Sequence, residues 1–171
     1  MPEAPCPSLR SAHQDDAAAI ASIYNDYVIE TVATFEAEPV NAAEMSSRLA
    51  DIEDRGLPWL VAEVVGEVVG YAYAAPWRSR AAYRRSVEIS TYLRPDATGR
   101  GLGTALYREL FVRLQDCGAH AVMAGIALPN DASVALHEKF GMRRVAHFRE
   151  VGHKFGSWID VAYWQVVPDT N

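Results

Sequence analysis

The sequence predicts one α/β domain with a mixed, mostly antiparallel central sheet and flanking helices. Apolar residues alternate with polar ones in some stretches, as in Val87–Leu93, and recur every third or fourth residue in others, as in Leu102–Leu114. These stretches follow the order β-α-α-β-β-β-α-β-α-β-β, which indicates mixed α/β structure. The 171 residues suffice for one substantial core. We expect this domain over residues 8–168, after a loose, proline-rich tail at residues 1–7.

Turn and cap residues divide the first half of the chain into segments. Asn41 is a typical helix N-cap, and Gly56 with Pro58 ends the helix that follows. A glycine between two apolar runs indicates a hairpin. The expected elements are a strand at Leu9–Ala12, a helix from Gln14 with apolar periodicity to Val28, an irregular Thr31–Pro39, a helix from Asn41 to Arg55, and strands Trp59–Val65 and Val68–Ala74 around a Gly66-Glu67 turn.

The second half is divided in the same way. A loop rich in arginine and aromatic residues, Ala75–Tyr83, precedes the strand at Val87–Leu93. Pro95 ends that strand because it has no N–H to donate. The remaining expected elements are a helix from Leu102 to Leu114, a buried strand at Ala121–Ala127, a short helix at Ala132–Phe140, and strands Met142–Val151 and Ser157–Val166 around a Gly152–Gly156 turn.

Composition excludes several classes of function. A net charge of −6 and a pI near 5.3 argue against a nucleic-acid partner, which requires a basic surface. No stretch is apolar enough to span a membrane, and the N-terminus lacks the features of a signal peptide. Cys6 and Cys117 have no metal or CxxC spacing, and the five histidines are not paired, so we expect no metal and a reducing, cytoplasmic setting.

A glycine-rich turn joins the Val87–Leu93 strand to the long helix, with Gly99, Gly101 and Gly103 at alternating positions. The first amides of a helix have no internal partner, and glycines let a ligand approach the backbone. This arrangement suits a phosphate or pyrophosphate. The spacing matches neither the P-loop nor the dinucleotide fingerprint. The glycines alone leave a ligand-free tight turn equally open.

The wider pattern resembles motif A of the GCN5-related N-acetyltransferase (GNAT) family, in which a strand, a spacer and an x-x-G-x-G turn open a helix. The resemblance implies the GNAT fold, with splayed central strands, and acetyl-CoA as co-substrate. Thr98 stands where the family usually has Gln or Arg, which leaves Arg100 as the positive charge of the turn. The implied cofactor-binding residues are Thr91, Tyr92, Leu93, Gly99, Arg100, Gly101, Leu102, Gly103, Thr104 and, in a later segment, Asn130.

Glu88 is the candidate general base. It is a carboxylate within an otherwise apolar strand, where burial would raise its pKa toward the working range. The strand pattern alone favours a structural glutamate, paired for example with Arg84 or Arg85. The family resemblance favours the base, because such acetyltransferases often carry an acid here. A backbone amide near Leu93 would then polarise the thioester carbonyl.

The segment NDASVALHEKFGM resembles a family pattern that supplies a cofactor-binding Asn and then often a Tyr that protonates the leaving thiolate. Asn130 matches the first position, and His137 occupies the second. An imidazole can carry out the same proton transfer. The alternative, a partly buried structural histidine, stays open.

Two loops are candidates for acceptor recognition, around Phe35 and from Trp77 to Arg85. Arginine and tyrosine can hold a carboxylate or phosphinate, and aromatic rings can cover apolar atoms. A solvated basic loop is the alternative. Together with TFEAEP, PWRSRAAYR and GHKFGSWIDVAYWQ, these loops resemble the phosphinothricin N-acetyltransferase subfamily over about Ile23–Gln165.

That resemblance implies transfer of acetyl to the α-amine of phosphinothricin, methionine sulfoximine or methionine sulfone, as detoxification. It implies a cytoplasmic homodimer, with Phe35, Arg80 and Tyr83 near the acceptor and Glu88 as base. We expect direct transfer in a ternary complex, without an acetyl-enzyme. The alternatives are an acetyltransferase for another amine, such as an antibiotic or a protein N-terminus, and an acyl-CoA-binding module without turnover.

Overall fold

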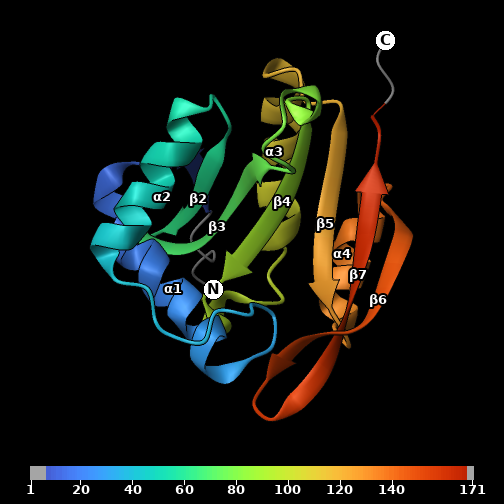
Figure 1. The fold of residues 1–171 in the computed structure, drawn as a ribbon. Coiled ribbons are helices and arrows are strands. Elements are labelled where there is room, and N and C mark those ends of the chain that lie inside the picture. Colours follow the sequence, from blue (N-terminus) through green and yellow to red (C-terminus); the bar gives the residue numbers. More distant parts are fainter. Residues whose placement is uncertain (1–6, 169–171) are drawn as a thin grey trace. The chain divides into compact units, whose positions relative to one another are not determined.

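The computed structural model describes residues 7–168, and its helices and strands follow the predicted order (Figure 1). The strands are hydrogen-bonded in the order β1-β2-β3-β4-β5-β7-β6. The chain packs as two compact units, and β4 (Ser86–Leu93) contributes to both. The first unit contains residues 7–24, Val40–Ala74 and Ser90–Cys117, and the second contains Asn25–Pro39, Ala75–Ile89 and residues 118–168.

The first unit is built on the hairpin of β2 and β3, with β1 antiparallel to β2. Helices α2 and α3 both pack against β2 (Figure 1). Four successive residues of β2, Trp59 to Ala62, are buried, and since successive side chains point to opposite faces, both faces of the strand are covered. Its elements are β1 (Ser8–Ser11), a 3₁₀ turn at Gln14–Asp16, the start of α1 (Ala17–Glu30), α2 (Ala42–Asp54), β2 (Trp59–Val64), most of β3 (Glu67–Pro76), a 3₁₀ turn at Pro95–Ala97 and α3 (Leu102–Asp116).

Local sequence signals explain the ends of these elements. Asn41 caps α2 as predicted, because its side chain accepts a hydrogen bond from the Glu44 amide at 2.8 Å. The predicted hairpin turn was wrong by one residue. Val65 and Gly66 form the turn with φ of 52° and 80°, and β3 begins at Glu67. Two consecutive positive φ angles match the right-handed twist of a hairpin, and this stabilises Val65 in a conformation that it seldom adopts.

The second unit contains β5, β7 and β6, the short helix α4, the end of α1 and the first residues of β4. β5 pairs in parallel with β4 from Ser86 to Glu88 and antiparallel with β7 along its length. The indole N–H of Trp164 on β7 donates to Glu138 of α4 at 3.2 Å. The elements are a 3₁₀ turn at Ala81–Tyr83, β5 (Ala121–Ala127), α4 (Asp131–Lys139), β6 (Arg143–Lys154) and β7 (Ser157–Val166).

The end of β6 differs from the prediction. The sequence predicted a strand to Val151 and a turn over Gly152–Gly156, but β6 continues to Lys154 and only Phe155 and Gly156 form the turn. The register is shifted between Phe148 and Gly152, where Glu150 has φ of 52°. A bulge of this kind bends a strand. Gly152 lies inside the strand, and this position requires a glycine because the Phe35 ring leaves no room for a Cβ.

Some predictions are not decided by the fold. The predicted tail lies outside the described residues, apart from Pro7. A single domain over residues 8–168 stays a prediction, because the chain packs as two units. Within residues 7–168, no helix is long and apolar enough to cross a membrane, and His, Cys, Asp and Glu side chains form no group suited to a metal ion.

Candidate active site

The glycine-rich turn in the first unit connects β4 to α3, in the order that the sequence predicted. After the 3₁₀ turn at Pro95–Ala97, Gly99 and Gly101 adopt φ of 72° and 78°, in the left-handed region. Gly101 is the N-cap of α3, and its carbonyl accepts the first helical hydrogen bond, from the Ala105 amide at 3.0 Å. The first turn of α3, whose amides have no partner within the helix, therefore starts at Leu102, directly after Gly101. This backbone suits an anionic group.

The side chains of this turn add one solvent-exposed positive charge. Arg100 is exposed, whereas Arg94 is paired with Asp96 and Glu67 at 2.6 and 3.1 Å. Thr98, at the position where the family has Gln or Arg, donates its hydroxyl to the Pro95 carbonyl at 3.0 Å. Thr98 therefore closes the turn locally.

The end of β4 is held by contacts within the first unit. The Thr91 hydroxyl donates to the Tyr71 carbonyl at 3.0 Å, and the Tyr92 ring packs edge-on to Tyr24 at 5.2 Å. The Leu93 side chain occupies the space that a Cβ on Gly70 would need. The cofactor-binding roles of Thr91, Tyr92 and Leu93, and the separation of β4 from β5, stay predictions.

The second unit contains a cavity of about 410 Å³ with a carboxylate in its wall. Glu88 of β4 provides this carboxylate, and the other walls are mainly apolar. The lining residues are Ala33, Phe35, Arg78, Glu88, Gly125, Ala127, Phe148, Val151, Val161 and Tyr163. A carboxylate among apolar side chains is the feature that the sequence predicted for a general base.

The environment of Glu88 changes its acidity. Burial raises the pKa of the Glu88 carboxyl above its ordinary value. The nearby Arg78 charge, a hydrogen bond from the Gly125 amide and one from the Tyr163 hydroxyl each lower this pKa and offset the effect of burial in part. The Glu88 carboxyl is therefore less acidic than an exposed glutamate. These properties suit a residue that takes up a proton during turnover.

Tyr163 was not predicted as a site residue, and Arg78 was predicted only as a member of the Trp77–Arg85 loop. Tyr163 of β7 lies opposite Gly125 of β5 in the sheet register, and the missing side chain at Gly125 leaves room for both the Tyr163 ring and the Glu88 carboxylate. The Arg78 guanidinium lies over the Trp77 ring, 4.3 Å from its centroid. In the sequence, the glycine within the otherwise apolar strand Ala121–Ala127 was the one local signal that other side chains approach the backbone closely at this point.

Of the three predicted acceptor residues, one lines the Glu88 cavity and two do not. Phe35 lines the cavity, and its ring lies on Gly152, where an added Cβ would be 2.2 Å from the nearest ring carbon. Arg80 and Tyr83 belong to the same loop as Arg78 but do not line this cavity. Their contact with an acceptor stays a prediction.

Asn130 and His137 have local roles in α4. Asn130 caps the helix, because its side-chain oxygen accepts a hydrogen bond from the Ser133 amide at 3.1 Å. His137 is 4% exposed, and its Nδ1 donates to the Ser133 carbonyl at 2.7 Å. Burial lowers the pKa of His137, partly offset by that hydrogen bond. A neutral ring protonated on Nδ1 has no proton to give from Nε2, so this geometry favours the structural alternative.

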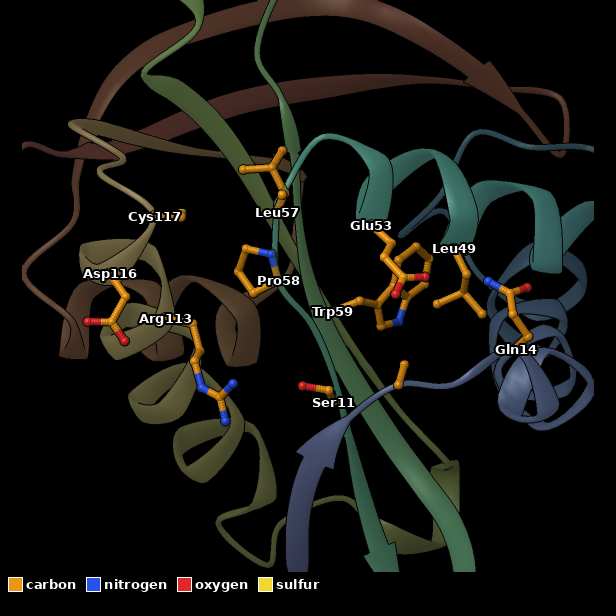
Figure 2. A pocket seen from close by; sticks show the side chains of 12 residues that line it. Ser11, Gln14, Leu49, Glu53, Leu57, Pro58, Trp59, Arg113, Asp116 and Cys117 are labelled. Carbon is orange, nitrogen blue, oxygen red and sulfur yellow. The ribbon is translucent and has the colours of Figure 1, made fainter.

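The first unit contains a second cavity, of about 430 Å³ (Figure 2). Residues of β2, α2 and the C-terminal end of α3 surround it, among them Trp59, Glu53 and Arg113. Glu53 and Arg113 are exposed, and Arg113 is paired with Glu109 at 2.7 Å. The Trp59 indole N–H is sealed from solvent and has no hydrogen-bond partner among the described residues. None of the predicted site residues lies here.

The chain is similar to known acetyltransferases over most of its length. The family profile described as "Acetyltransferase (GNAT) domain" matches residues 9–163. The chain belongs to this GNAT acetyltransferase family. Two curated relatives are the L-amino acid N-acyltransferase MnaT of Escherichia coli, 42% identical over 95% of this chain and 94% of the relative, and the L-methionine sulfoximine/L-methionine sulfone acetyltransferase of Salmonella typhimurium, 39% identical over 95% of both.

Solved structures give the same family. A GNAT phosphinothricin acetyltransferase from Sinorhizobium meliloti, solved with acetyl-CoA, is 40% identical, with a TM-score of 0.91 over 94% of this chain and 88% of that one. The predicted GNAT family and its phosphinothricin and methionine sulfoximine relatives are thereby confirmed, as is the predicted fold class of a mixed α/β sheet with flanking helices.

Proposed function

We propose that this chain is an acetyl-CoA-dependent N-acetyltransferase that modifies the α-amine of a small amino acid or amino-acid analogue. The observation that supports the proposal most directly is the Glu88 cavity, in which an ionisable carboxylate of raised pKa lies among apolar side chains. The named activities of relatives at about 40% identity belong to the same class. Detoxification of methionine sulfoximine, methionine sulfone or phosphinothricin is the corresponding biological role.

We infer that the glycine-rich turn holds acetyl-CoA. Its two left-handed glycines and the start of α3 suit a pyrophosphate, and Arg100 is an exposed positive charge beside them. The predicted set for this role is Thr91, Tyr92, Leu93, Gly99, Arg100, Gly101, Leu102, Gly103, Thr104 and Asn130. Acetyl-CoA supplies the activated acetyl group, and the chain supplies binding and a base.

We infer direct transfer between the two substrates. The acceptor must present a neutral amine, so Glu88 takes one proton from its ammonium group, directly or through a water. The amine attacks the thioester carbonyl carbon and a C–N bond forms. The C–S bond then breaks, and the second proton on the nitrogen passes to the departing CoA sulfur or to water, so that the products are the N-acetylated acceptor and CoA. Arg78 and Tyr163 hold Glu88 through charge and hydrogen bonding. Cys117 lies outside the lining of the Glu88 cavity and takes no part.

The cavity also supports a preference among acceptors. Arg78 is the one basic side chain among the described residues that line it, and it can pair with the α-carboxylate that every amino acid carries. The apolar walls, among them Val151 and Val161, offer no second cation for an anionic side chain. We therefore propose that methionine sulfone and methionine sulfoximine are better acceptors than phosphinothricin, whose side chain is a second anion.

We also propose that the chain is a homodimer. The hairpin of β6 and β7 exposes several large apolar side chains that do not line the Glu88 cavity, including Val145, Phe155 and Trp158, at 57%, 62% and 66%. Exposed apolar side chains on neighbouring strands are typical of protein interaction surfaces. Sedimentation at micromolar concentration tests the assembly, and a monomer there would count against it.

A thiol-release assay with acetyl-CoA tests the activity. The acceptor panel comprises methionine sulfone, methionine sulfoximine, phosphinothricin, methionine, glutamate, spermidine and a short peptide. Turnover that is highest with the sulfone and sulfoximine supports the proposal. Turnover confined to spermidine or peptide would overturn the acceptor class, and acetyl-CoA binding without turnover of any amine would favour a module that only binds acyl-CoA.

A further inference from the structure

Lys154 is a buried cation at the end of β6. It is 7% exposed, and its Nζ donates to the carbonyl oxygens of Thr31 and Thr34 at 2.7 and 2.8 Å. Burying an ammonium is costly unless its hydrogen bonds are satisfied. Burial accordingly lowers the pKa of Lys154, with the Glu36 charge opposing that effect. The chain has only two lysines, and Lys139, the other one, is exposed.

The two carbonyls belong to an irregular segment, Thr31–Glu36, which follows α1. Its hydrogen bonds include two short-range ones: the Thr31 hydroxyl donates to the Tyr27 carbonyl at 2.9 Å, and the Ala33 amide donates to the Thr31 hydroxyl at 3.1 Å. Such bonds shape the segment locally but do not attach it to a strand. The ammonium of Lys154 provides two hydrogen bonds from β6 to this segment.

The same face of β6 receives the side chain of Phe35. Gly152 and Lys154 are two residues apart on the strand, both are buried, and side chains at that spacing point to the same side. The Phe35 ring fills the space above Gly152, with ring carbons 2.2 to 2.9 Å from where a Cβ would be. Ring packing and ammonium binding therefore dock the Thr31–Glu36 segment on one patch of β6.

This docking matters because the segment forms part of the Glu88 cavity. Ala33 and Phe35 line the cavity, and they are the two sequence neighbours of Thr34, whose carbonyl Lys154 binds. We propose that Lys154 is a positioning residue for acceptor binding, which fixes the Thr31–Glu36 segment so that Phe35 and Ala33 close the wall beside Glu88. This inference rests on the proposed function, since it assigns the cavity to the acceptor.

The test compares Lys154→Met with Lys139→Met, which makes the same chemical change at the exposed lysine. Kinetics with methionine sulfone and acetyl-CoA are combined with amide hydrogen exchange of the peptide that covers residues 31–36. We expect Lys154→Met to raise the KM for the acceptor at least about tenfold, because loss of a positioning contact displaces the wall. The KM for acetyl-CoA should stay within about twofold, and exchange should rise in residues 31–36.

Two further variants keep the inference testable if Lys154→Met folds poorly. Lys154→Arg retains a cation with several donors and should restore part of the acceptor affinity and of the exchange protection. Gly152→Ala leaves the ammonium in place but forces the Phe35 ring away, and should reproduce the increase in acceptor KM.

The outcomes separate this inference from the proposed function. Faster exchange in residues 31–36 with unchanged acceptor KM would overturn the positioning role, as would equal losses for both substrates. Lys139→Met with the same kinetic defect would show a non-specific effect and overturn it too. If wild-type protein turns over none of the amino-acid acceptors, the proposed function fails first, and the assignment of this wall to acceptor binding fails with it.

Discussion

The two cavities, one in each unit, have nearly the same volume but differ in chemistry. The first-unit cavity, of about 430 Å³, is bordered by charged side chains that reach solvent, such as Glu53 and Asp116. The second-unit cavity, of about 410 Å³, contains a carboxylate whose pKa burial has raised. Cavity size therefore does not identify the candidate active site. The decisive difference is a partly desolvated Glu88 with hydrogen-bond donors directed at it.

The largest expected effect comes from removing the carboxylate in the second-unit cavity. Glu88→Gln should lower kcat about 10²- to 10⁴-fold, because the acceptor ammonium then loses its general base. Steady-state kinetics with methionine sulfone measures this. Glu53→Gln, the same change in the first-unit cavity, serves as the matched control and should leave kcat unchanged. Similar activity in the two variants would remove the distinction between the cavities.

A smaller effect concerns the pH profile. Glu88 acts as a base only when ionised, so turnover falls as the pH drops through its pKa. Arg78 lowers that pKa, so Arg78→Gln should raise it and move the acid limb of kcat/KM to higher pH. Tyr163→Phe should move the limb in the same direction by less, because the Tyr163 hydrogen bond is the smaller influence.

The control for this profile is Arg84→Gln, which removes an exposed charge from the same loop. The titration of the acceptor amine is common to all variants, so differences between their acid limbs report on the enzyme. A limb that moves to lower pH in Arg78→Gln, or equally in Arg84→Gln, would contradict the electrostatic role of Arg78.

Local sequence signals were sufficient for the order of the helices and strands. Apolar periodicity, the Asn41 and Asn130 caps and the glycine turns specify each element from its own residues, and the element order followed from them. The predicted hairpin turn was wrong by one residue, because the twist of the two strands places the positive φ angles at Val65 and Gly66. The end of β6 depends on distant contacts: Gly152 pairs with Ile159 inside the strand, and the Phe35 ring requires a glycine at that position.

The candidate site was predictable only in part, for the same physical reason. Glu88 could be identified because a carboxylate in an apolar strand is a local anomaly. Tyr163 became a site residue only through the register of β7 against β5, which places it opposite Gly125. Arg78 and Arg80 belong to one loop and have the same chemistry, so no periodicity distinguishes them. The conformation of the loop places only Arg78 in the cavity lining.

The smallest expected effect concerns Cys117, which is exposed and lies in the lining of the first-unit cavity. Direct transfer needs no nucleophilic cysteine, so Cys117→Ser should keep kcat and both KM values unchanged. Intact-mass measurement after incubation of wild-type protein with acetyl-CoA should show no acetylated protein, because no covalent intermediate forms. A stable acetyl adduct on Cys117, together with loss of turnover in Cys117→Ser, would assign the chemistry to the first-unit cavity and reverse the comparison.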